Sequence, residues 1–101
     1  MKIKRLKKIK INSFTFAIKW TNKHDGGSFD YSKREIEIGT RGNHEDTILQ
    51  VLTHELFEIC ALDVGVRYNR RDVSDDYYFV YDHRQHDLIM NMFSGLLAKF
   101  I

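Results

Sequence analysis

Apolar and polar residues alternate through the first 40 positions in the pattern that half-buried β-strands require. Every second residue is a large apolar one in two runs, 9–11 and 14–20, and the alternation changes phase at Asn12-Ser13. Since each run has one apolar face, this phase change predicts a tight turn and a hairpin. Residues 29–31 and 35–38 repeat the pattern and predict a second hairpin.

The apolar positions change to helical spacing after residue 43. Asn43 is expected to cap a helix whose first turn is acidic, and Gly65 is expected to stop it, so that the helix runs to about Asp63. Residues 48–62 are apolar around most of the helical circumference. This distribution predicts a helix that is largely buried.

A second helix is predicted near the end of the sequence. Asp82 and Gln85 have the spacing of a capping box, which would start this helix at His83. Between the two helices, residues 66–76 are polar and expected to be irregular, and residues 77–81 form a short β-like run. The irregular segment contains three arginines that are expected to be solvated: Arg67, Arg70 and Arg71.

These elements predict one α+β domain, in which an antiparallel sheet of two hairpins is covered by two helices. A chain of 101 residues with 43% hydrophobic residues has room for a single core. No apolar run approaches the ~20 residues of a membrane span. Cys60 is the one cysteine in the sequence, so no internal disulfide can form and a metal ion becomes a candidate stabiliser.

The positive charge of the sequence is concentrated at its start. The formal net charge is only +2, but the first ten residues contain Lys2, Lys4, Arg5, Lys7, Lys8 and Lys10. Lysines commonly keep an edge strand soluble, and no aromatic residue is interleaved among these for base stacking. The basic run therefore predicts a solvated strand, and nucleic-acid binding is not expected.

The predicted first helix carries polar residues on a narrow part of an otherwise apolar surface. At about 100° per residue, Gln50, His54 and Glu58 share a stripe about 80° wide, which indicates the wall of a groove. His54 and Glu58 are four residues apart, a spacing that lets two side chains bind one ion. Glu55 is offset from His54 by about 100°. The pattern is H-E-x-x-H of zinc hydrolases, with Glu58 in place of the second histidine.

A catalytic zinc site needs a third protein ligand. His83 and His86 are the candidates, because both open the second helix on the side of its apolar face. Either one would complete a set of two histidines and one glutamate, with a fourth position open for water. The alternative is that the whole motif is a solvated helix face, since H-E-x-x-E has low specificity in a charged helix.

The chain resembles small zincin-like metalloprotein domains that phages and prophages encode. The resemblance covers most of the length and rests on the strand at 35–38, the motif Leu52-Thr53-His54-Glu55-Leu56, and the closing helix. Familiar members have H-E-x-x-H and a later glutamate, so the second histidine and the later acid are exchanged here. The resemblance implies one Zn²⁺ per chain, Glu55 as general base, and the metal ligands His54, Glu58 and His83, with His86 less favoured.

Two functions follow as alternatives. The first is a zinc-dependent hydrolase of the peptidase type, in which Glu55 takes the proton of a zinc-activated water. In that case the strand at 35–38, if it borders the groove, could pair with an extended peptide. The second is a non-catalytic, zinc-stabilised module that inhibits or captures a host protein. Both imply a peptide or protein partner, and the oligomeric state stays open. The expected location is the cytoplasm, that of the host for a phage protein, because the sequence has no run of membrane-span length and its charged start is unlike a signal-peptide core.

Overall fold

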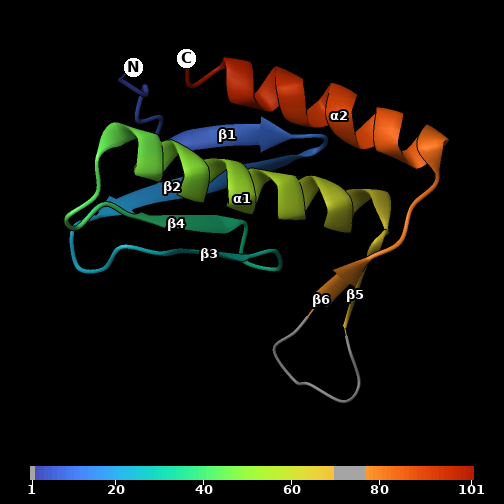
Figure 1. Cartoon of the computed structure of the whole chain (residues 1–101), viewed down its shortest axis with the longest axis horizontal. Helices are drawn as coiled ribbons and strands as arrows, with labels where there is room; N and C mark the ends of the chain where they lie inside the picture. The colour runs from blue at the N-terminus through green and yellow to red at the C-terminus, as the bar shows by residue number, and fades with distance from the viewer. Residues whose placement is uncertain (1, 70–76) are drawn as a thin grey trace.

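The computed structural model describes residues 2–69 and 77–101 and shows a small α+β domain (Figure 1). Both predicted hairpins and both predicted helices are confirmed. The elements described are β1 (Lys8–Ile11), β2 (Phe14–Thr21), β3 (Gly27–Asp30), β4 (Glu35–Gly39), α1 (Glu45–Val64), β5 (Arg67–Asn69), β6 (Tyr77–Phe79) and α2 (His83–Ala98).

Four strands form one sheet in the order β1-β2-β4-β3. The pairs β1–β2 and β3–β4 are antiparallel, as the two hairpins require, but β2 and β4 run parallel. The prediction of a purely antiparallel sheet is therefore wrong, because the second hairpin docks on β2 through β4. Ile36 and Ile38 of β4 are both buried, whereas β3 contributes only the partly buried Phe29 to the core. The more apolar strand of the hairpin takes the central position.

Helix α1 begins at Glu45, one residue later than the predicted cap Asn43 would place it. The N-cap is His44, whose side chain makes no capping hydrogen bond. Asn43, the predicted cap, instead donates from Nδ2 to the carbonyl oxygen of Asp25, 3.0 Å away. The end of the helix agrees with the prediction, since Gly65 terminates it with a left-handed φ of 85°, a conformation that glycine adopts without steric cost.

The segment between the helices contains a strand that was not predicted. β5 pairs antiparallel with β6, so the prediction of an irregular segment is wrong for residues 67–69. Its polar sequence lacks a strand signal, and the conformation depends on pairing with β6. The rest of that segment, with Arg70 and Arg71, lies outside the described residues. Helix α2 then begins with the predicted capping box of Asp82 and Gln85.

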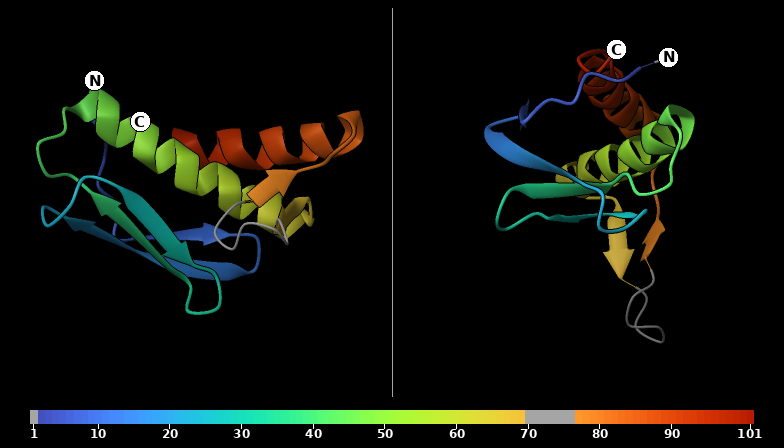
Figure 2. Two further views of the ribbon diagram at one scale, coloured as in Figure 1. Left: turned by 60° about the horizontal axis from the view of Figure 1, so that its bottom comes forward. Right: turned by 90° about the vertical axis from the view of Figure 1, so that its left-hand side faces the viewer.

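Both helices lie on the same side of the four-stranded sheet (Figure 2). Helix α1 packs on β3 and β4, and α2 packs on α1. Cys60 is buried in this core, as predicted. None of the helices in residues 2–69 and 77–101 is long and apolar enough to cross a bilayer. The largest fully buried side chains include Ile11, Phe16, Ile36, Ile38, Leu52, Leu56, Ile59, Ile89 and Phe100.

Candidate metal centre

Three potential metal ligands lie together on α1. His54, Glu55 and Glu58 each offer one ligand atom, and these atoms lie within 4.8 Å of one another. In the described part of the chain, no other group of three or more histidine, cysteine, aspartate or glutamate side chains meets this criterion. Helical geometry brings His54 and Glu58 together because residues four apart lie one turn above the other.

The contact between His54 and Glu58 is direct. His54 Nε2 lies 2.5 Å from Glu58 Oε2, and the His54 side chain is 67% exposed whereas that of Glu58 is 16% exposed. Gln50 lines the same hollow as these two residues, which confirms the predicted polar stripe along the wall of a groove. The solvent-facing imidazole and the largely covered carboxylate together present one nitrogen and one oxygen donor to an ion.

Glu55 lies beside this stripe, faces Gly27 of β3, and lines a further hollow together with Gln50 and His54. Its side chain is 8% exposed, and its Oε2 lies 3.9 Å from His54 Nε2. Strand β3 lies against it, since a Cβ atom at Gly27 would be 3.2 Å from Glu55 Oε2 and 2.6 Å from Val51 Cγ1. Burial is the largest influence on the pKa of Glu55 and raises it above its ordinary value. A raised pKa makes this carboxylate a stronger base than an ordinary glutamate.

Arg67 is the residue of the cluster that sequence reasoning missed. Its Nε donates to Glu58 Oε1 at 3.0 Å, and its side chain is only 14% exposed, so the prediction of a solvated arginine is wrong. The guanidinium carbon lies 3.6 Å from the centre of the Tyr77 ring and 5.2 Å from that of Phe29. No local sequence signal indicated this contact, because Arg67 reaches Glu58 only through the pairing of β5 with β6.

An aromatic hollow opens beside His54 and Glu58. It has a volume of about 750 Å³ and lies between α1, α2 and β6. Phe57 forms edge-to-face contacts with Phe79 and Phe93, with ring centres 6.2 Å and 5.8 Å apart. Apolar walls with a few polar groups at one end are typical of ligand sites. The lining residues are Gln50, Thr53, His54, Phe57, Glu58, Tyr77, Phe79 and Phe93.

His83 and His86 are not part of the cluster on α1. The side chain of His83 is 90% exposed. Phe93 of α2 contacts Phe57. His83 precedes Phe93 by ten residues, which is about 15 Å along the helix at 1.5 Å per residue. The start of α2 lies near the C-terminal end of α1 (Figure 1), so both histidines are displaced from His54 along the helix. A third ligand from α2 stays a prediction.

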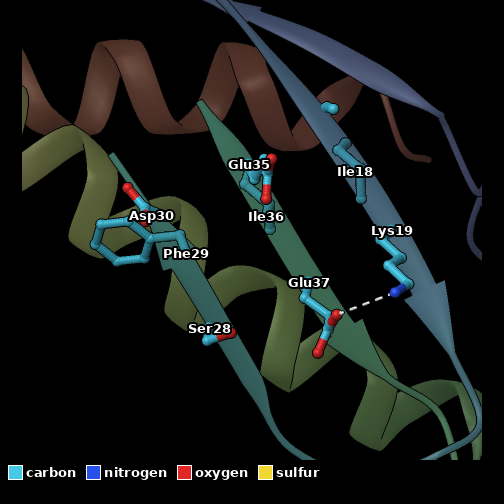
Figure 3. Close-up of a pocket in the computed structure, with 9 residues that line it drawn as sticks. Ile18, Lys19, Ser28, Phe29, Asp30, Glu35, Ile36 and Glu37 are labelled. Atoms are coloured by element: carbon cyan, nitrogen blue, oxygen red, sulfur yellow. Dashed lines mark ion pairs between the residues drawn. The ribbon is translucent and has the colours of Figure 1, made fainter. Parts of the chain in front are cut away.

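A second hollow, of about 440 Å³, lies over β2, β3 and β4. Figure 3 shows it on the face of the sheet turned away from the helices, with Lys19, Glu35 and Glu37 among its lining residues. Glu37 is already paired: its Oε1 lies 3.7 Å from Lys19 Nζ, and its Oε2 lies 2.7 Å from His24 Nε2. This arrangement is typical of a solvated sheet face with surface ion pairs.

The strand predicted to border the groove has no free edge. β4, which contains residues 35–38, lies between β2 and β3 and pairs with both. The prediction that this strand could pair with a peptide is therefore wrong. β3 is the edge strand on that side of the sheet, and its Gly27 lies against Glu55.

Comparison of the chain with protein-family models, with curated proteins and with solved structures found no match. Its function therefore has to be inferred from the residues of the site.

Proposed function

We propose that this protein is a minimal zincin-like, zinc-dependent hydrolase of the peptidase type. The observation that carries the proposal is the convergence of His54, Glu55 and Glu58 within 4.8 Å beside an aromatic-walled hollow. Imidazole nitrogen and carboxylate oxygen are both ligands of Zn²⁺ in proteins. When bound, the ion would supply the Lewis acidity that polarises a carbonyl group and makes water more acidic.

His54 and Glu58 are the proposed ligands, because their donor atoms already lie side by side. Glu55 is the proposed general base: its Oε2, 3.9 Å from His54 Nε2, would accept a proton from water and return it to the amine nitrogen of the leaving group. The raised pKa of this buried carboxyl supports a reversible role. His83, with His86 as the alternative, is the proposed third ligand and would require the first turn of α2 to approach the cluster.

The proposed substrate is an extended segment of a peptide or protein. The hollow beside the ligands would accept an apolar side chain against the rings of Phe57, Phe79 and Phe93. Strand β3 lies at the edge of the sheet beside Glu55, and an edge strand can pair with an extended backbone. Together these two surfaces would hold a peptide across the cluster, and the proposed location of the reaction is the cytoplasm.

One observation favours a second candidate function. The carboxylate of Glu55 belongs to the same 4.8 Å group as the two proposed ligands, so all three side chains could bind the ion. Glu55 would then be unable to act as a base, and zinc would only stabilise the fold. The protein would in that case be a binding module that inhibits or captures another protein.

The variant Glu55→Gln separates the two functions. The amide can still form a hydrogen bond with water but cannot accept its proton, so we expect the variant to retain zinc and to lose all cleavage of a broad peptide library. Elemental analysis, thermal melting with and without a chelator, and the cleavage assay provide the three measurements. Glu35→Gln is the matched control, since it makes the same change on the far face of the sheet (Figure 3) and should alter none of them.

Each outcome has one interpretation. Loss of zinc from Glu55→Gln would identify Glu55 as a ligand, and absence of cleavage by zinc-loaded wild type would likewise favour the binding module. Wild-type protein without zinc, whose melting curve a chelator does not change, would refute both functions. Zinc titration of His83→Ala and His86→Ala identifies the third ligand, and unchanged affinity in both variants would exclude a ligand from α2.

A further inference from the structure

We infer that Arg67 is a positioning residue for the metal ligand Glu58, an inference that rests on the proposed zinc site. The two oxygens of Glu58 have different partners. Oε1 accepts the hydrogen bond from Arg67 Nε at 3.0 Å, and Oε2 lies 2.5 Å from His54 Nε2. An ion held by His54 and Glu58 would bind Oε2, while Oε1 stays with Arg67. The arginine thus determines which oxygen faces the ion.

Arg67 can fix Glu58 because its own side chain is held on several sides. It is 14% exposed, and its guanidinium carbon lies 3.6 Å from the centre of the Tyr77 ring and 5.2 Å from that of Phe29. The two rings belong to β6 and β3, so two elements far apart in the sequence restrain the guanidinium. A planar guanidinium can stack on aromatic rings and form a directed hydrogen bond at the same time, which an ammonium group cannot.

The register of the β5–β6 hairpin explains this stack. Arg67 is opposite Phe79 in the pairing, and Asn69 is opposite Tyr77. Arg67 and Tyr77 are therefore diagonal neighbours on one face of the hairpin, within reach of long side chains. The same face supplies Tyr77 and Phe79 to the wall of the aromatic hollow. Arg67 accordingly links the position of Glu58 to the part of the hairpin that a ligand would contact.

Arg67 would have the opposite effect if it competed with the ion for Glu58. Its hydrogen bond is made to Oε1, whereas Oε2 is the oxygen beside His54 Nε2, so Arg67 and the other proposed ligand use different oxygens of Glu58, which argues against competition. Carboxylates that bind metals are usually held by a further hydrogen bond, and loss of such a partner typically lowers metal affinity about 10–100-fold. Removal of the guanidinium should therefore weaken zinc binding.

The test is calorimetric titration of metal-free wild type, Arg67→Met and Arg67→Lys with Zn²⁺. We expect Arg67→Met to bind zinc about 10–100-fold more weakly than wild type. The zinc affinity of Arg67→Lys should lie between those of wild type and Arg67→Met, because lysine keeps the charge but lacks the planar group. Arg34→Met is the matched control: Arg34 stacks on the Phe14 ring at 3.7 Å, outside the cluster, and its loss should not change zinc affinity. The melting temperature of each metal-free variant, compared with that of metal-free wild type, measures how much stability the substitution removes apart from zinc binding.

The outcomes distinguish this inference from the proposed function. Zinc affinity of Arg67→Met equal to that of wild type, or higher, would overturn the role of Arg67 and leave the zinc site standing. Wild type that binds no zinc would overturn both. If Arg67→Met does not fold, Arg67→Lys decides, since wild-type affinity in the lysine variant would mean that the directed guanidinium contact is not needed.

Discussion

The variant Gly27→Ala tests how closely β3 has to approach α1. A Cβ atom at this position would lie 2.6 Å from Val51 Cγ1 and 3.1 Å from Glu55 Cγ. Carbon atoms in favourable contact are about 3.5–4.0 Å apart, so the strand or the Val51 side chain would have to move by about 1 Å. Valine in a helix has one strongly preferred rotamer, which makes it difficult for Val51 to turn away.

The expected cost is the balance of two effects. Forcing an extra carbon into a packed contact costs about 1–3 kcal/mol. Gly27 is not among the glycines with positive φ, so alanine can adopt its backbone conformation. Alanine also restricts the unfolded chain, which stabilises the folded state by about 0.4–1 kcal/mol. The free energy of unfolding should therefore fall by about 1–2 kcal/mol, and the melting temperature by roughly 4–15 °C for a domain of this size.

Thermal and urea unfolding followed by circular dichroism measure this loss. Gly26→Ala is the control, since its Cβ would meet nothing within 4 Å, and it should be at least as stable as wild type. The double variant Gly27→Ala/Val51→Ala should be less destabilised than the sum of its two single variants, because it removes the short contact. Equal melting temperatures for Gly27→Ala and Gly26→Ala would show that the approach of β3 to α1 imposes no constraint.

Two further predictions concern the buried thiol and the cap of α2. Burial raises the pKa of Cys60 from 9.0 to about 12, so a thiol reagent at pH 8 should react about a thousandfold more slowly with folded than with urea-unfolded protein; similar rates would contradict this. The free energy of unfolding should also fall as the pH rises from 9 toward 12, because the thiol ionises first in the unfolded chain. Asp82→Ala removes the carboxylate that accepts a hydrogen bond from Gln85 N at 2.9 Å. The free energy of unfolding, measured with urea, should fall by about 0.5–2 kcal/mol. Asp82→Asn keeps a capping oxygen and should lose little, and equal stability of Asp82→Ala and wild type would mean that the cap contributes nothing.

The sequence by itself determined the elements whose signals are local. The phase change at Asn12-Ser13 marks the observed turn, where Asn12 adopts a left-handed φ of 54°. The capping box at Asp82 starts α2 at the predicted residue. The meeting of His54 and Glu58 belongs to the same category, because one helical turn separates residues four apart in any α-helix. All these features depend on interactions between residues close together in the sequence.

Only the tertiary structure decided what surrounds these elements. The second hairpin could dock on β2 through either of its strands, and burial of Ile36 and Ile38 selects β4. The packing of Phe93 on Phe57 determines where α2 begins relative to α1, and it leaves His83 outside the cluster. Arg67 reaches Glu58 because β5 pairs with β6. Each of these outcomes depends on contacts between residues distant in sequence, which local periodicity does not encode.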